Sequence, residues 1–193
     1  MKDGKLTSTL PVQRTCPEHT DRFAMASSLQ SISGYVAADL PSARSMKFGI
    51  IVSDWNREIT DALYKGTLRL LMDCGAQEKN LFICRVPGSF ELTAAAMLMA
   101  ENRNPDAVIC LGCVIRGETR HADYISHAVA QGITHLSLKY GKPFIFGVLT
   151  PNNIRQARAR AGGRHGNKGH EAAATAIRMI AIRNKLTGKS SKM

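Results

Sequence analysis

The chain has 193 residues, of which 44% are hydrophobic and 21% charged, which is typical of one globular domain with a core of its own. It has no run of eighteen apolar residues, and its first thirty residues lack the apolar core of a signal peptide, so we expect no membrane partner. Five cysteines, an odd number scattered through apolar stretches, favour reduced thiols and a cytoplasmic location over a disulfide framework.

The net charge of +11 is concentrated near the C-terminus. Residues 151–193 hold ten Lys and Arg against the single acid Glu171, so this quarter of the chain carries +9. A basic segment of this kind can bind nucleic acid through phosphate contacts. Because it contains no Phe, Tyr or Trp to stack on bases, we favour a solvated helix face with some contact to a substrate phosphate, and we predict no nucleic-acid partner.

The sequence pattern changes after residue 45. Residues 1–45 show no clear periodicity and are rich in Ser, Ala, Pro and Thr, which indicates a largely flexible N-terminal arm before a domain at residues 46–193. The domain starts with a short apolar strand at residues 47–53. Apolar residues then recur at helical spacing from Ile59 to Cys74, and Gly75 follows where a helix cap is expected.

The rest of the domain alternates strand and helix. Further strands are predicted at residues 81–86, 107–115 and 144–149. Helical segments are predicted at residues 90–100, from 121 to beyond 136, at 153–161 and at 167–186, the last two separated by Gly162 and Gly163. Repeated strand–helix alternation implies right-handed crossovers and a parallel sheet with helices on both faces. The predicted fold class is therefore α/β, a three-layer, flavodoxin-like arrangement with a four-stranded parallel sheet.

The third predicted strand ends in the most informative segment of the chain, residues 112–124. The strand is followed by the turn Arg116–Thr119, and an amphipathic helix starts near His121. Ligands bind at the carboxyl ends of parallel strands, and the N-terminus of a helix suits phosphate. His121 is therefore a candidate for proton transfer, with a surface histidine at the start of a helix as the alternative.

Two other strand ends carry candidate binding residues. Trp55, the only tryptophan, follows the first strand, and its ring is either a core or interface anchor or a stacking plate for a planar heterocycle. Pro87 and Gly88 end the second strand in a tight turn, after which backbone groups are able to hydrogen-bond a flat ring at the sheet edge. Glu91 fits this site or, equally, a first-turn carboxylate that complements the helix dipole.

Cys110 and Cys113 form a C-x-x-C match inside the third strand. Side chains three residues apart in a strand point to opposite faces, so this pair does not have the geometry of a redox or zinc site. No second cysteine pair and no H-E-x-x-H spacing supports a metal. We predict buried structural thiols and no metal site.

Four ordered motifs together resemble the 6,7-dimethyl-8-ribityllumazine synthase family, although each alone is weak evidence. The resemblance covers about residues 46–186. It implies the penultimate enzyme of riboflavin biosynthesis. The motifs are VPGSFE at 86–91, GCVIRGETRH at 112–121, FGVLT at 146–150 and RAGGRHGNKGHEAA at 160–173.

The resemblance also implies roles for individual residues. Trp55 corresponds to the aromatic residue that stacks on the pyrimidine, and His121 to the proton-transfer residue. Phe146 and Arg160 correspond to residues supplied by a neighbouring subunit, the arginine to bind phosphate. The segments that hold the uracil edge, the ribityl chain and the four-carbon phosphate, with two charged residues near the site, correspond to Ser89, Phe90, Glu91, Cys113, Val114, Ile115, Glu118, Thr119, Lys168 and Glu171.

The implied reaction joins 5-amino-6-(D-ribitylamino)uracil with 3,4-dihydroxy-2-butanone 4-phosphate and needs no cofactor. The resemblance further implies a homo-oligomer whose sites are shared between subunits, built from pentamers, and riboflavin synthase as a candidate partner. The short turn at residues 162–167 resembles that of members that assemble into icosahedral capsids. Two alternatives come from other classes: a flavodoxin-like module that stores a flavin, and a basic scaffold that packages polyanions.

Overall fold

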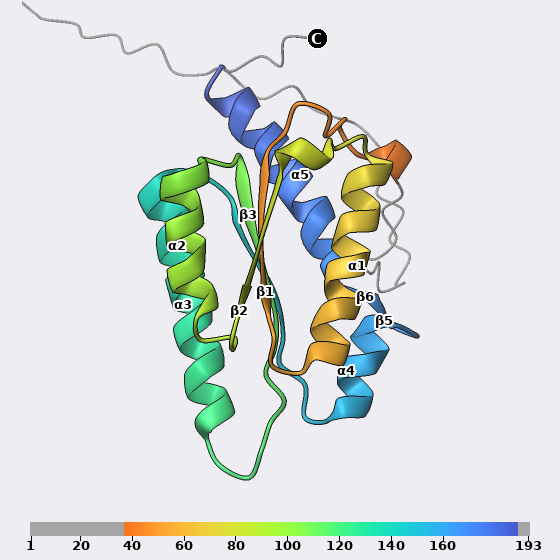
Figure 1. Ribbon diagram of the computed structural model, residues 1–193, viewed down its shortest axis with the longest axis vertical. Helices are drawn as coiled ribbons and strands as arrows, with labels where there is room; N and C mark the ends of the chain where they lie inside the picture. Colours follow the sequence, from red (N-terminus) through yellow and green to blue (C-terminus); the bar gives the residue numbers. More distant parts are fainter. Residues whose placement is uncertain (1–36, 189–193) are drawn as a thin grey trace, which may run out of the picture.

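The computed structural model describes residues 37–188, which form an open parallel sheet between two layers of helices (Figure 1). The sheet strands are β1 (Phe48–Ser53), β2 (Leu81–Val86), β3 (Ala107–Cys113) and β4 (Phe144–Leu149). The α-helices are α1 (Arg57–Asp73), α2 (Leu92–Arg103), α3 (His121–Tyr140), α4 (Ile154–Arg160) and α5 (Lys168–Leu186). The strand order is β2-β1-β3-β4 and every pairing is parallel. The predicted fold class is confirmed.

The central strands β1 and β3 are buried along their whole length. Helices α1, α4 and α5 cover one face of the sheet, and α2 and α3 cover the other (Figure 1). Ile50 of β1 lies in register with Ile83 of β2 and Ile109 of β3, which aligns the strand ends at one edge of the sheet. Strands covered on both faces favour apolar residues at successive positions, which explains the nearly continuous apolar runs of β1 and β3.

The two cysteines of the C-x-x-C match lie on opposite faces of β3. Cys110 packs among residues of α2 and α3, whereas Cys113 packs in the core beside α1 and α5. Burial raises the pKa of both thiols to about 12. The predicted burial of both thiols is confirmed.

Helices α1 and α5 approach each other closely at the first turn of α5. A Cβ on Gly169 would collide with the backbone carbonyl of Leu63, so only glycine allows this approach. The Thr67 hydroxyl lies within hydrogen-bond distance of two carbonyl oxygens, 3.0 Å from that of Leu63 and 2.9 Å from that of Gly169. Asn167 caps α5 by accepting from the N–H groups of Gly169 and His170, and it also donates to Ala62 of α1. The start of α5 is therefore fixed against α1.

Several element boundaries differ by one or two residues from the predicted ones, and the turn between α4 and α5 contains a strand pair that was not predicted. Helix α2 begins at Leu92 rather than residue 90, and β3 ends at Cys113 rather than residue 115. The turn between α4 and α5 is a small antiparallel hairpin, β5 (Ala161–Gly163) and β6 (Gly166–Asn167). Positive φ angles at two of its glycines, Gly162 and Gly166, allow the tight reversal, and so short a ladder leaves no periodicity in the sequence.

The described part of the expected N-terminal arm lies against the domain. Ala43 is fully buried, and its N–H donates to the carbonyl of Cys74 at 2.8 Å. A 3-10 turn at Ala37–Asp39 precedes it, and another, Glu78–Asn80, leads into β2. Residues 1–36 of the expected arm are outside the described residues. Between residues 37 and 188, no helix is both long enough and apolar enough to cross a membrane.

Candidate active site

A cleft of about 560 Å³ lies at the carboxyl edge of the sheet, where β1, β2 and β3 end side by side. The loops after these strands and the first turn of α3 form its walls (Figure 1, lower end of the sheet). This is where an open parallel sheet offers loops and helix N-termini to a ligand. Its lining residues are Trp55, Gly88, Ser89, Phe90, Glu91, Cys113, Val114, Ile115, Gly117, Thr119, His121, Ala122 and Ile125.

The loop after β1 presents Trp55 at the mouth of this cleft. The Trp55 N–H donates to the carbonyl of Pro87 at 3.0 Å, which ties the loop to the one after β2. The Trp55 side chain is 70% exposed. Trp55 is therefore not a core residue of this chain, and the interpretations as an interface anchor and as a stacking plate remain.

Two residues that support this loop were not predicted from the sequence. Asn56 adopts the left-handed conformation, with φ of 58°, and its side-chain amide donates to the carbonyl of Cys113 at 2.9 Å. Arg85 on β2 pairs with Asp54 and Asp61, and these hydrogen bonds raise its pKa. An asparagine directly before a predicted helix, a residue type that tolerates the left-handed conformation, was the available indication for Asn56. Nothing in the mostly apolar sequence of β2 indicated the role of Arg85.

Ser89 combines burial with an unpaired hydroxyl. The residue is 6% exposed, and among residues 37–188 no group hydrogen-bonds its Oγ. Gly112 lies directly beside it, since a Cβ at that position would meet Ser89 Oγ at 2.6 Å. Buried hydroxyls are normally paired, so this lining residue is suited to accept or donate a hydrogen bond to a polar ligand.

His121 is the first residue of α3 and lines the cleft. Its backbone N–H donates to the Thr119 hydroxyl at 3.4 Å, whereas Arg120 at the cap position makes no side-chain capping bond. The positive end of the helix dipole therefore faces the loop at residues 114–120, which favours an anion there. Glu118 belongs to this loop but is exposed and does not line the cleft.

Within one chain, Phe146 and Arg160 do not line the cleft that His121 lines. Phe146 is half-buried on β4 and lines a second cavity of about 440 Å³, next to Asp123 and His127 of α3. Arg160, at the end of α4, lines a third cavity of about 460 Å³ together with Arg155, Arg164 and His165. The single chain does not bring all the predicted site residues into one cavity.

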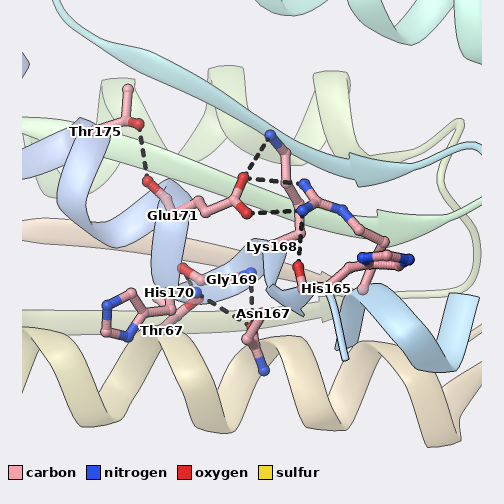
Figure 2. A network of polar contacts seen from close by, with 9 residues as sticks. Thr67, His165, Asn167, Lys168, Gly169, His170, Glu171 and Thr175 are labelled. Atoms are coloured by element: carbon pink, nitrogen blue, oxygen red, sulfur yellow. Dashed lines mark hydrogen bonds and ion pairs between the residues drawn. The ribbon is translucent and has the colours of Figure 1, made fainter. Parts of the chain in front are cut away.

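Arg160, Lys168 and Glu171 form one ionic cluster at the junction of α4 and α5 (Figure 2). The Glu171 carboxylate lies 3.0 Å from Arg160 Nη1, 3.1 Å from Arg160 Nη2 and 3.2 Å from Lys168 Nζ. Its side chain is 4% exposed, against 35% for Arg160 and 29% for Lys168. A buried carboxylate held by two cations in this way is strongly anchored.

These features define an α/β protein of the flavodoxin-like class with a ligand cleft across the carboxyl edge of its parallel sheet. The model of the 6,7-dimethyl-8-ribityllumazine synthase family matches residues 45–184. The chain belongs to this family and is an enzyme of the class that the family comprises. The family resemblance of the sequence motifs is confirmed.

Curated relatives carry the same family description, 6,7-dimethyl-8-ribityllumazine synthase. A protein of Cytophaga hutchinsonii is 51% identical over 157 residues, which is 81% of this chain and 98% of the relative. One of Parabacteroides distasonis is 50% identical over 81% of this chain and 98% of its own length. One of Bacteroides fragilis is 51% identical over 70% of this chain and 94% of its own length.

Proposed function

We propose that this enzyme condenses 5-amino-6-(D-ribitylamino)uracil with 3,4-dihydroxy-2-butanone 4-phosphate, yielding 6,7-dimethyl-8-ribityllumazine, phosphate and water, in the penultimate step of riboflavin biosynthesis. The observation that carries the proposal is the composition of one cleft. It combines His121 at a helix N-terminus, the exposed ring of Trp55 and the unpaired hydroxyl of Ser89. A proton carrier, a stacking surface and a polar contact are what two small reactants of this kind need.

The pyrimidine binds between aromatic and backbone groups in this proposal. Trp55 stacks on the ring, while residues 89–91 and 113–115 hold the uracil edge and the ribityl chain. Most of these groups are backbone N–H and C=O, whose direction is set by the strand ends. The separation of the two reactants is thereby fixed before reaction, which accounts for much of the rate enhancement of condensations.

The chemistry proceeds by proton transfers. The amine attacks the ketone carbon, and loss of water gives an imine. Elimination then breaks the C–O bond to phosphate, and attack of the second nitrogen closes the ring with loss of a second water. His121 moves the protons in these steps, because the two nitrogens of an imidazole can both accept and donate a proton. The steps require no electron transfer, and no cofactor is part of the proposal.

The phosphate is held from two sides in this proposal. Glu118, Thr119 and the start of α3 approach it from one chain, and Arg160 of a neighbouring copy approaches from the other. Phe146 of that neighbour completes the pocket around the pyrimidine. The separate cavities that Phe146, Arg160 and His121 line in one chain support a shared site. A head-to-tail contact of this type closes into a ring.

We further propose that the ring is a pentamer and that pentamers form an icosahedral capsid, with riboflavin synthase as a candidate partner. Analytical ultracentrifugation separates the assembly states, because a capsid sediments far faster than a pentamer. A single pentamer-sized species at every concentration and buffer rejects the capsid. A cytoplasmic location is also proposed, because the cysteines are odd in number and scattered through apolar stretches.

The proposed reaction is tested by incubating purified protein with the two substrates and following lumazine formation by absorbance and phosphate release. Repeated turnover, many products per site, is expected. A flavin-storage module or a polyanion scaffold instead binds its ligand without forming lumazine. Binding of riboflavin with no product would therefore reject the enzyme in favour of the storage module.

A further inference from the structure

We propose that Glu171 is the positioning residue of the phosphate site. Its carboxylate pairs with the two terminal nitrogens of the Arg160 guanidinium and leaves one edge of that group open for the phosphate. The inference deepens the proposed function and rests on it. Glu171 then influences the substrate through Arg160 rather than by touching it, so it is not itself a catalytic residue.

The Glu171 carboxylate is fully engaged by cations. Its Oε1 lies 3.0 Å from Arg160 Nη1, and its Oε2 accepts from Arg160 Nη2 at 3.1 Å and from Lys168 Nζ at 3.2 Å (Figure 2). The side chain is only 4% exposed. A carboxylate enclosed in this way has no surface left to offer to a substrate, but it fixes the orientation of the planar group that it pairs with.

The hydrogen bonds of Arg160 leave a defined edge unused. A guanidinium has five N–H groups. Nη1 lies against Glu171 and also donates to the carbonyl of His165 at 2.9 Å, while Nη2 uses one hydrogen for Glu171. The Nε–H and the second Nη2 hydrogen remain, and no group within residues 37–188 accepts from them. These two hydrogens point the same way along one edge of the group and match two oxygens of a phosphate.

The charge of the cluster suits an anion as well. Two cations face one carboxylate, so the triad of Arg160, Lys168 and Glu171 keeps a net charge of +1. The cavity that Arg160 lines also includes the exposed Arg155 and Arg164. Glu171 therefore orders the arginine without cancelling the positive field around it. An arginine ordered before binding loses less conformational entropy when phosphate arrives.

The start of α5 does not depend on Glu171 for its position. Asn167 caps the helix through the N–H groups of Gly169 and His170, at 2.8 and 3.2 Å. Thr67 and Gly169 lock it against α1. Removing the carboxylate therefore leaves the helix anchored, and the orientation of Arg160 is the feature that changes.

The test compares wild-type assembled enzyme with Glu171→Gln and with Glu58→Gln as the matched control. Glu58 makes a bidentate pair with Arg158, at 2.8 and 3.0 Å, but is largely exposed and lines none of the three cavities. The measurements are KM for each substrate and the Kd of inorganic phosphate by calorimetry. We expect Glu171→Gln to raise the ketose phosphate KM and the phosphate Kd about tenfold, since one charge-assisted contact is lost. The pyrimidine KM of Glu171→Gln should change less than about twofold, and so should both KM values and the phosphate Kd of the control Glu58→Gln.

A purely electrostatic role predicts the opposite sign, because deleting a negative charge beside an anion site tightens anion binding. An equal or lower phosphate Kd in Glu171→Gln overturns the proposal, as does wild-type protein that binds no phosphate. If Glu171→Gln does not fold, Glu171→Asp replaces it as the test variant. Aspartate keeps the negative charge but is shorter by one methylene, so the positioning role predicts the same loss of phosphate affinity. Unchanged phosphate binding in Glu171→Asp contradicts the positioning role.

A double mutant isolates the route through Arg160. In an Arg160→Ala background, Glu171→Gln should change the ketose phosphate KM by less than about twofold, since the group that it orients is gone. A further large increase means that Glu171 acts independently and rejects the positioning role. Failure of the proposed function is distinguishable from all of these results, because wild-type enzyme would then form no lumazine while phosphate titration still reports on Glu171.

Discussion

The hydroxyl of Thr67 on α1 lies 2.9 Å from the carbonyl oxygen of Gly169 on α5, which places the two helix backbones almost in contact. Gly169 lies two residues before Glu171, so the close packing and the Arg160–Glu171 pair share the first turn of α5. Backbone packing at this point therefore determines where two of the predicted site residues, Lys168 and Glu171, can lie.

Gly169→Ala should be strongly destabilising. The new Cβ would collide with the Leu63 carbonyl, a backbone atom that cannot rotate away, so we expect a loss of about 3 kcal/mol, the upper end of overpacking costs. Urea denaturation of the assembled protein measures it. Gly117→Ala is the control for stability, because nothing lies within 4 Å of the added Cβ there. Equal midpoints for the two variants would contradict the contact.

His121→Asn should lower kcat while both KM values change little, because asparagine fills the same place but its amide can neither accept nor release a proton near neutral pH. General acid–base groups contribute about 10²–10⁴-fold, and we expect the low end because amines and ketones condense unaided. His135→Asn, on the exposed side of the same helix, should retain full activity. An unchanged kcat in His121→Asn removes this residue from the mechanism.

Arg160→Ala should raise KM for the ketose phosphate far more than KM for the pyrimidine. Loss of a charge-assisted contact costs about 1.5–3 kcal/mol, which is roughly tenfold to a hundredfold in affinity. Lysine at this position should restore only part of the affinity for the ketose phosphate, since it lacks the planar guanidinium with its paired N–H donors. Arg158→Ala, two residues away and paired with Glu58 at the surface, is the matched control. Equal effects on both substrates would argue against a phosphate role.

Trp55 should bind flavin-like rings, including riboflavin. The hypothesis rests on an indole that is 70% exposed at the mouth of the cleft and offers a large π-face. Because it is the only tryptophan, its fluorescence reports binding without interference. Riboflavin should quench it in a saturable manner, and Trp55→Phe should bind more weakly in equilibrium dialysis. Absence of saturation at high micromolar riboflavin would count against the hypothesis.

Mixed assemblies test the shared site directly. His121→Asn and Arg160→Ala chains, each impaired alone, should regain some activity when they are unfolded and refolded together, because some of the interfaces then carry both native residues. The result is compared with each variant refolded alone. No recovery despite demonstrated co-assembly would mean that both residues act within one chain.

The strands and most helices could be predicted from the sequence because a sheet covered on both faces imposes a simple pattern. Every position of β1 and β3 is buried, so both strands are mostly apolar runs, with Ser53 at the end of β1 as the polar exception. The residues of the main cleft could be predicted for a related reason. They directly follow three of these runs, and parallel strands carry their ends to one edge of the sheet.

What only the tertiary structure decided is which side chains meet across distant segments. Nothing local pairs Arg85 with Asp54 and Asp61, because such contacts depend on strand order rather than on spacing along the chain. The burial of Glu171 and its pairing with Arg160, eleven residues away, could not be seen in a sequence that presents Glu171 only as a charged residue near the site. Within one chain, Arg160 and His121 line different cavities. Sequence determines local periodicity and strand ends, whereas burial and long-range pairing arise only when the layers pack.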